Sequence, residues 1–324
     1  MSSYSRRHHN IPRFYLARFT DSGEATGSLW VLDNHDARLW PSTPDGTGFE
    51  KDLYRVEHSE IPADSLEKEF AKLEGDASEV IRRIVLSGEL PSTPDDFNTL
   101  LNFVSLLNVR IPDFINAREA ALGKLANITM RMVLETPERW AEQVERMAES
   151  GRTVKPGVTY EKRKEFIERG EYEVVADQNW KLTWLLEAHD MSLPLFAQRT
   201  WHLLVAAEDA PDFVTSTRPV LLRFTTPVPA FYSPGLGLKN TEVLLPLSRR
   251  HLLLGRFEES ERIVVADSIT VARANSLIVG SASRVILPAH ELAWCDGENR
   301  IKALGDWLEH LRKVKDQSHV RVTV

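Results

Sequence analysis

Residues 62–110 read PADSLEKEFAKLEGDASEVIRRIVLSGELPSTPDDFNTLLNFVSLLNVR, and this stretch contains two predicted helices. The first helix lies in its N-terminal half. Apolar side chains recur at helical spacing, so that they fall on one stripe. The members of this stripe are Leu66, Phe70, Leu73, Ala77, Val80, Ile81, Ile84 and Val85. Asp64 or Ser65 is suited to be the N-cap, and Gly88 to end the helix. We therefore expect one amphipathic helix from about Ser65 to the residue before Gly88.

A second helix follows in the same stretch. Thr93 with Asp96 three residues later resembles a capping box, with Asp in place of the usual Glu. The apolar residues continue to the neighbourhood of Arg110, where Pro112 forces a break or a new start. Further helical patterns cover residues 114–134, a segment from Pro137, 161–173 and 177–199. The centre of the chain is therefore a helical block.

Strand patterns flank this block on both sides. The first fifty residues are typical of short strands and turns, among them residues 11–19 and 28–33, with a loop at 41–49. After Thr200 the predicted strands are 201–206, 213–215, 220–224, 242–245, 252–254, 262–265 and 285–286, and the predicted helices are 268–281 and 301–311. This segregated order favours an α+β fold with N-terminal strands, a central helical block and a C-terminal mixed or antiparallel sheet with two helices. It also allows the two β parts to meet in one sheet.

Length and composition set the remaining limits on the fold. The chain has 324 residues, 42% of them hydrophobic and 27% charged, which indicates a globular protein with a substantial core. We expect two packed parts, residues 1–150 and 151–324, because the turn-rich segment 151–158 is the best internal border. The lone cysteine, Cys295, can form no internal disulfide. No signal peptide and no apolar run of membrane-spanning length is present, so we expect a cytoplasmic protein without a membrane partner.

The N-terminal segment, residues 9–19 with the sequence HNIPRFYLARF, resembles the start of a bacterial family, domain of unknown function 4238. Family members begin with His-x-x-Pro-x-Phe-Tyr-Leu-x-x-Phe. Residues 29–33, 49–54, 110–112 and 213–220 are similar to later family segments. One departure concerns function: the family usually has Ser-Asp-x-Pro where this chain has Ser216, Thr217, Arg218 and Pro219. If that aspartate is catalytic in the family, Thr217 argues against the same activity here.

Four residues suggest a metal-dependent phosphodiesterase or nuclease-like enzyme. Carboxylates and a histidine can hold a divalent ion that activates water against a phosphodiester. We predict His9, Asp52 and Glu74 as catalytic residues and Asp52, Glu67 and Glu74 as ligands of Mg²⁺ or Mn²⁺. Glu67 and Glu74 are seven residues apart, which places them about 10 Å apart along one helix face. They could equally be solvated or paired with neighbouring lysines and arginines.

Three arginines are predicted to bind the substrate: Arg110, Arg13 and Arg218. Arg110 stands at the end of an apolar helix, where its guanidinium can donate paired hydrogen bonds to a phosphate or carboxylate. The same side chain could instead bond to the free carbonyls at the helix end. A basic groove would suit a nucleic acid or nucleotide, although the net charge of −7 excludes a uniformly basic surface.

Two other function classes stay open. One is a non-catalytic sensor or partner-binding protein, in a stress or phage-defence setting, which Thr217 favours. The other is an ADP-ribosyltransferase, in which residues 215–217 would form the strand motif, Glu259 and Glu261 the glutamate pair, and Arg199 would hold the dinucleotide phosphates. An enzyme requires its candidate residues to gather in one pocket, whereas a binding module requires an exposed partner surface.

Overall fold

The computed structural model describes residues 7–152, 157–170, 172–229, 231–257 and 262–318. The chain forms two compact units. The first unit consists of residues 1–111 and 182–324, and the second of residues 112–181. The helical second unit is thus inserted into the first in sequence, and neither border falls at the predicted residues 150 and 151.

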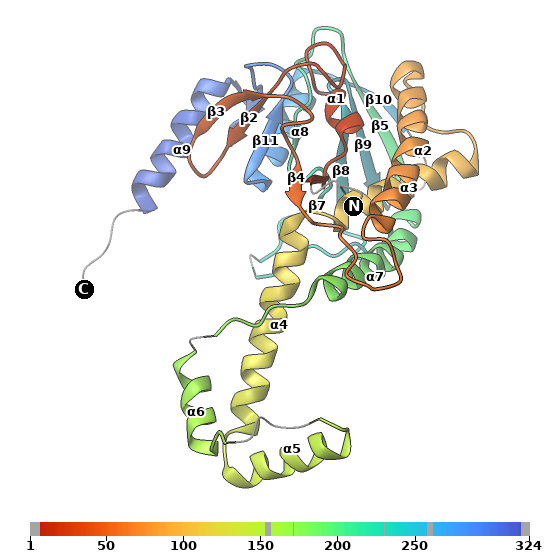
Figure 1. The fold of residues 1–324 in the computed structure, drawn as a ribbon. Coiled ribbons are helices and arrows are strands. Elements are labelled where there is room, and N and C mark those ends of the chain that lie inside the picture. The colour runs from red at the N-terminus through yellow and green to blue at the C-terminus, as the bar shows by residue number, and fades with distance from the viewer. Residues whose placement is uncertain (1–6, 153–156, 171, 230, 258–261, 319–324) are drawn as a thin grey trace. The chain divides into compact units, whose positions relative to one another are not determined.

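The first unit combines helices and strands in the predicted α+β manner (Figure 1). Its helices are α1 (Arg13–Ala17), α2 (Ser65–Ser87), α3 (Pro94–Val109), most of α7 (Gln178–Ala197), α8 (Ser268–Ser281) and α9 (Leu304–Ser318). Its strands are β1 (Arg7–His9), β2 (Leu29–Asp33), β3 (Arg38–Ser42), β4 (Phe49–Lys51), β5 (Thr200–Ala206), β6 (Thr215–Ser216), β7 (Leu221–Phe224), β8 (Thr241–Ser248), β9 (His251–Arg256), β10 (Arg262–Ala266), β11 (Arg284–Leu287), β12 (Trp294–Cys295) and β13 (Ile301–Lys302).

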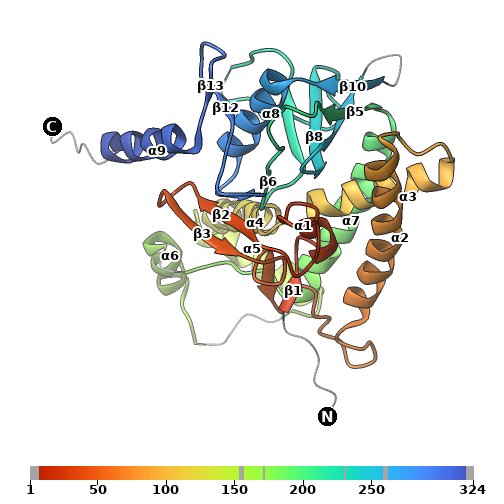
Figure 2. The same cartoon turned by 90° about the horizontal axis from the view of Figure 1, so that it is seen from above.

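A five-stranded mixed sheet, in the order β10-β5-β9-β8-β7, forms the centre of this unit. Its pairs are antiparallel except β10 with β5, which is parallel. Along β8, alternate side chains enter two different clusters: Val243 and Leu245 pack with α2 and α3, whereas Leu244 packs with α8. Figure 2 shows these helices on opposite sides of β8. Helices on both faces explain why every residue of β8 is buried.

A second sheet joins the two ends of the chain. Its order is β3-β2-β11-β6, with every pair antiparallel, so that N-terminal strands lie beside C-terminal ones. The expectation that the two β parts can meet in one sheet is confirmed. A separate two-stranded pair, β1 with β4, sets His8 opposite Glu50 and His9 opposite Phe49.

The helix caps of the central block agree with the sequence. The Thr93 hydroxyl accepts a hydrogen bond from the Asp96 backbone N–H at 3.2 Å. Gly88 ends α2 in the left-handed conformation with φ of 69°, which costs glycine little.

The expectation of strands throughout the first fifty residues is wrong at residues 13–17, which form the helix α1. Ile11, Tyr15 and Phe19 are spaced four residues apart and are all completely buried. Tyr15 and Leu16 are adjacent and both completely buried, whereas a strand with one exposed face would send only alternate residues inward. The predicted loop at 41–49 also begins later, because Pro41 and Ser42 still belong to β3.

The second unit is helical, with α4 (Pro112–Val133), α5 (Pro137–Glu149), α6 (Tyr160–Arg169) and the first turn of α7. Its contacts run along one side of α4: the Asn127 amide donates to the Tyr172 hydroxyl at 2.7 Å, and Lys181 pairs with Glu119 at 3.0 Å. Its buried apolar side chains are few among the described residues, namely Ile115, Leu134, Ile167 and Ala176. Across the described parts of both units, no helix has the length and apolar character needed to cross a membrane.

Candidate functional site

The end of α3 places an arginine in the interior of the first unit. α3 is buried on most of its circumference, so the residue that follows it also enters the core. Arg110 has an exposed fraction of 0%. Its backbone N–H donates to the Leu106 carbonyl and caps the helix, but its side chain turns away from the helix end. The guanidinium donates from Nη1 to Oε1 of Glu74 on α2 at 2.6 Å. Two residues predicted from the sequence, Glu74 and Arg110, are therefore in direct contact.

The ion pair with Glu74 engages only one nitrogen of the Arg110 guanidinium. Nε and Nη2 are buried and have no hydrogen-bond partner among the described residues. The hydroxyl of Tyr54 is also buried and without a partner in the described part of the chain. Nε–H and Nη2–H lie side by side on one edge of the guanidinium, the edge that binds two oxygens of a carboxylate or phosphate. Three polar atoms of one region thus lack the partners that buried polar groups normally have.

Tyr54 is held beside this pair by a histidine. The Tyr54 backbone N–H donates to Nδ1 of His8 at 2.8 Å, and the two rings stack with centroids 5.6 Å apart. Because Nδ1 accepts this hydrogen bond, the proton of the neutral imidazole is on Nε2. Nε2 lies 3.5 Å from Oε2 of Glu67. We call His8, Tyr54, Glu67, Glu74 and Arg110 the Arg110 cluster.

Burial keeps the Tyr54 hydroxyl protonated. Desolvation is the largest cause of the raised pKa of Tyr54, and Arg110 lowers that pKa in part. The carboxylates of Glu74 and Glu67 raise the pKa further. A phenol with a raised pKa remains a hydrogen-bond donor at neutral pH. The open edge of Arg110 and the Tyr54 hydroxyl can therefore all donate to acceptor oxygens.

The predicted residue His9 lies on the other side of β1, because successive strand residues point to opposite faces. Its ring packs against Phe49 at 6.0 Å. Burial is the main cause of its lowered pKa, followed by the charge of Arg13. Arg13 is exposed and pairs with Asp45 at 3.3 Å, and Arg7 pairs with the same carboxylate. The structure thus brings His8, and not His9, into contact with the acidic residues of α2.

The predicted metal ligands do not gather. Among the described residues no group of three or more His, Cys, Asp or Glu side chains could hold a metal ion, and Asp52, Glu67 and Glu74 form no such group. Glu67 faces His8 and Glu74 faces Arg110, so the two carboxylates are engaged separately. Asp52 adopts a left-handed backbone with φ of 55° in the turn after β4.

Arg218 and Thr217 lie elsewhere in the fold. Arg218 is exposed, and its backbone N–H donates to the Ser216 hydroxyl at 3.1 Å. No contact between described residues joins Arg218 to the Arg110 cluster. The backbone N–H and the hydroxyl of Thr217 both donate to the Arg284 carbonyl, at 3.0 and 3.3 Å. Thr217 therefore extends the pairing of β6 with β11.

The arginine required by the ADP-ribosyltransferase hypothesis has a structural role. Arg199 donates to the backbone carbonyls of Thr241, Gly255 and Leu236, and its guanidinium lies 4.5 Å from the ring centroid of Phe257. Both Nη nitrogens of Arg199 are thus bonded to the protein itself. Glu259 and Glu261 lie outside the described residues.

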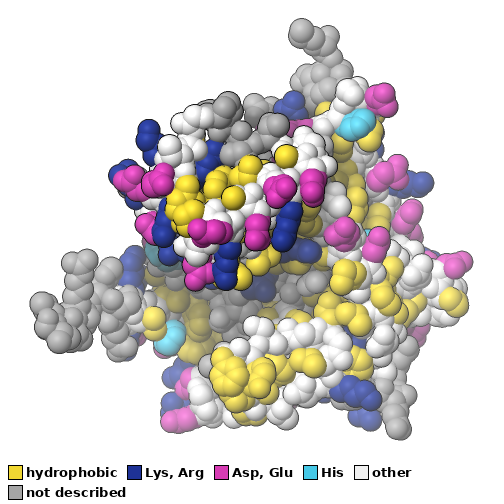
Figure 3. Space-filling model, turned by 90° about the horizontal axis from the view of Figure 1, so that it is seen from below, with side chains coloured by type: hydrophobic (Ala, Val, Ile, Leu, Met, Phe, Trp, Pro, Cys, Tyr) yellow, Lys and Arg dark blue, Asp and Glu magenta, His cyan; other side chains and the backbone are white. Residues whose placement is uncertain are grey.

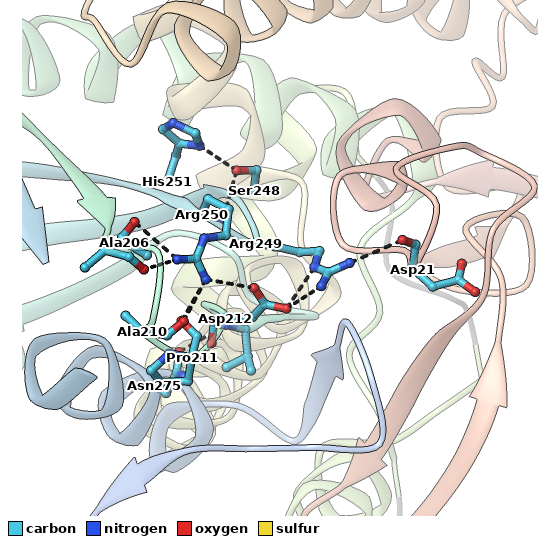
Figure 4. A network of polar contacts seen from close by, with 12 residues as sticks. Asp21, Ala206, Ala210, Pro211, Asp212, Ser248, Arg249, Arg250, His251 and Asn275 are labelled. Atoms are coloured by element: carbon cyan, nitrogen blue, oxygen red, sulfur yellow. Dashed lines mark hydrogen bonds and ion pairs between the residues drawn. The ribbon is translucent and has the colours of Figure 1, made fainter. Parts of the chain in front are cut away.

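A second polar network, which the sequence did not suggest, surrounds Asp212 (Figure 4). Arg249 reaches one carboxylate oxygen at 2.7 Å and Arg250 the other at 3.3 Å. Arg250 also donates to the carbonyls of Ala206 and Ala210. Asp212 borders a mainly apolar cleft of about 480 Å³. With both carboxylate oxygens bonded to arginines, Asp212 fixes the β8–β9 hairpin to the wall of this cleft.

Comparison with known proteins identifies a family and no function. No curated protein and no solved structure matches the chain. The family model described as "Protein of unknown function (DUF4238)" matches residues 7–290, which include every residue of the Arg110 cluster. Because this match covers most of its length, the chain belongs to the DUF4238 family.

Proposed function

We propose that this protein is a ligand-binding protein whose site is the Arg110 cluster, and that the ligand presents a singly charged group with two acceptor oxygens. The observation that carries this proposal is the completely buried Arg110, whose Nε and Nη2 donors have no partner among the described residues. The proposal corresponds to the alternative of a non-catalytic sensor or partner-binding protein that was predicted from the sequence.

Buried hydrogen-bond donors without partners lower the stability of the folded protein. A buried donor without a partner costs roughly 1–3 kcal/mol, and more if it is charged. Arg110 has two such donors and Tyr54 adds a third polar atom. A bidentate oxyanion would satisfy both guanidinium donors at once. A ligand that occupies the site for part of the time would supply the missing partners of these groups.

The charges of the cluster restrict the ligand. Glu74 pairs with Arg110, and Glu67 adds a second carboxylate beside the neutral form of His8. The formal charge is therefore one positive against two negative groups. A dianion such as a phosphate monoester would be repelled more strongly than a monoanion. A carboxylate or a phosphodiester fits this limit, and a phosphodiester would agree with the nucleic-acid partner predicted from the sequence.

The two glutamates are the members of the cluster that solvent reaches most. The Glu74 side chain is 23% exposed and that of Glu67 is 34% exposed, whereas His8 and Tyr54 are buried. Since the open edge of Arg110 is enclosed, binding requires a local opening of this region. His8 has one ring nitrogen bonded to the Tyr54 backbone and the other facing Glu67, so it is poorly placed to act as a catalytic base.

Melting and calorimetry with small anions test the proposal. Acetate, dimethyl phosphate and inorganic phosphate are compared at equal ionic strength, because a ligand that binds only the folded protein raises its melting temperature. We expect acetate or dimethyl phosphate to stabilise the wild type, and inorganic phosphate above its second pKa to do so less. Arg110→Lys should weaken binding by about 10-fold or more, because lysine cannot present two parallel donors.

Two further variants make this test specific. Tyr54→Phe removes only the unpartnered hydroxyl, so it should fold normally and bind more weakly. Arg13→Gln is the matched control, since Arg13 is exposed and pairs with Asp45 outside the cluster. Its binding should equal that of the wild type. If no monoanion stabilises the wild type, or if Arg110→Lys binds as well as the wild type, the proposed site is refuted.

The same melting experiment tests the hypothesis of a metal-dependent phosphodiesterase. Because no three-ligand group exists among the described residues, we expect neither Mg²⁺ nor Mn²⁺ to raise the melting temperature. A clear rise with either ion that is lost in Glu74→Gln would favour the phosphodiesterase over the sensor.

A further inference from the structure

An apolar stripe runs along the exposed side of α4. Many surfaces of this protein carry scattered apolar side chains, and Figure 3 shows several on one face. The stripe on α4 differs in being regular, with spacings of three or four residues. Its members are Phe114, Ala117, Ala121, Leu125, Ile128 and Met132. Leu125, Ile128 and Met132 are 61%, 57% and 60% exposed. Such spacing is the pattern of a helix that packs against another helix.

The second unit does not use this side of α4. At 100° per residue, the stripe lies opposite the positions that make the internal contacts of the unit. Those positions include Glu119, Asn127 and Leu134, which contact Lys181, Tyr172 and Tyr160. Because the buried apolar residues of this unit are so few, leaving three large ones exposed is costly.

The stripe is complementary to itself when it is reversed. Its first half contains the small residues Ala117 and Ala121, and its second half the larger Leu125, Ile128 and Met132. In an antiparallel pair centred near residue 123, each small residue lies opposite a large one of the other copy. A parallel pair would instead set small against small and large against large. Interlocking of this kind fills space better than equal residues face to face.

Charges at the ends of the stripe agree with the same arrangement. Asp113 and Arg131 are both exposed and lie on the same flank of the stripe. In the antiparallel pair Asp113 of one copy comes beside Arg131 of the other, twice by symmetry. In a parallel pair these two residues would lie at opposite ends of the interface, and no Asp113–Arg131 pair would form between the copies.

We propose that two copies of this chain associate through α4, in an antiparallel pair with two-fold symmetry. The apolar stripe is thus covered by α4 of a second copy. The apolar residues and two Asp113–Arg131 ion pairs hold the two helices together. This association is independent of the anion site, because no member of the stripe belongs to the Arg110 cluster.

Sedimentation of the full chain over a range of concentrations tests the proposal. The wild type should form dimers, and the double variant Leu125→Glu with Ile128→Glu should weaken them by about 100-fold or more, because four large side chains lose their burial. Both sites are exposed, so the fold should be retained, as circular dichroism will show. Leu86→Glu is the control: it alters a side chain that is 72% exposed on α2, and it should leave the dimer unchanged.

A charge exchange tests the antiparallel geometry. Asp113→Arg alone and Arg131→Asp alone should each weaken the dimer, and the two combined should restore it, because both ion pairs are then reversed. Salt should reduce these differences. A wild type that stays monomeric at every concentration, or a dimer that Leu125→Glu with Ile128→Glu leaves intact, overturns the proposal. Failure of the exchanged double variant to recover overturns the antiparallel arrangement.

Discussion

Removing the two partners of the Arg110–Glu74 pair one at a time should have unequal effects on stability. In Glu74→Met the completely buried guanidinium keeps its charge and loses its only side-chain acceptor among the described residues, so that Nη1 joins Nε and Nη2 without a partner. Breaking a buried ion pair in this way costs about 3–5 kcal/mol. In Arg110→Met the remaining carboxylate is 23% exposed, so water can solvate it. We expect a smaller loss, about 2–3 kcal/mol.

The double variant Arg110→Met with Glu74→Met completes the cycle. It removes both charges and all three donor nitrogens of the guanidinium, and methionine adapts well to irregular space. Replacement of a buried ion pair by apolar residues is often neutral or stabilising, so the double variant should lie within about 1 kcal/mol of the wild type. It should nevertheless lose the stabilisation by acetate or dimethyl phosphate. If the Arg110–Glu74 pair serves only stability, these anions should stabilise neither the wild type nor the double variant.

Equilibrium unfolding in urea, followed by circular dichroism in buffer free of carboxylates and phosphates, gives the three free energies. The ratio of the two single losses is the decisive quantity, because both variants create similar apolar surface. Equal losses, or a greater loss in Arg110→Met, would show that Glu74 and not Arg110 is the group that depends on the pair. A double variant whose loss equals the sum of the single losses would mean that the two side chains do not interact.

Three further changes test the packing and ionisation of the first unit. Burial, with two nearby arginines, lowers the pKa of His251, so the folded state favours the neutral ring. The contribution of His251 to stability should be complete above the unfolded pKa of about 6.5 and should be lost as the pH falls below it. His251→Gln should reduce this loss, as urea midpoints measured against pH will show. Gly255→Ala would place a Cβ 2.8 Å from the Trp201 ring and should lower the free energy of unfolding by about 1–3 kcal/mol, measured by urea unfolding. Tyr15→Phe removes a buried hydroxyl that donates to the Pro246 carbonyl at 2.7 Å, and it should cost about 1–3 kcal/mol in the same assay.

Local signals in the sequence were sufficient for the helices of the central block. The cap formed by Thr93 and Asp96 and the end at Gly88 both depend on residues close in sequence, and both are confirmed. The predicted range of α8, residues 268–281, agrees with the structure for the same reason. By contrast, α1 is a short helix, and most of its apolar residues are buried in the core. Its five residues are too few to distinguish the repeat of a helix from the alternation of a strand.

The candidate site could be predicted only in part. Glu67, Glu74 and Arg110 were selected from the sequence, and the structure places the two glutamates beside His8 and Arg110. Tyr54 was missed because nothing in its own neighbourhood indicates burial; its position depends on His8, 46 residues earlier in the chain. Which of two adjacent histidines faces the acids depends on the register of a three-residue strand, and a short strand has no pattern from which to read it.

The N-terminal motif, residues 9–19, is mainly a structural element of this protein, and this affects how the protein's function should be sought. Ile11, Tyr15 and Phe19 are completely buried, and the Tyr15 hydroxyl contacts Thr215 and Pro246, about two hundred residues later. The motif therefore fastens the start of the chain to the C-terminal part of the first unit. Only its flank, at His8, reaches the Arg110 cluster. Substitutions within the motif should consequently lower stability before they alter binding, whereas Tyr54→Phe and Arg110→Lys address the proposed ligand site directly.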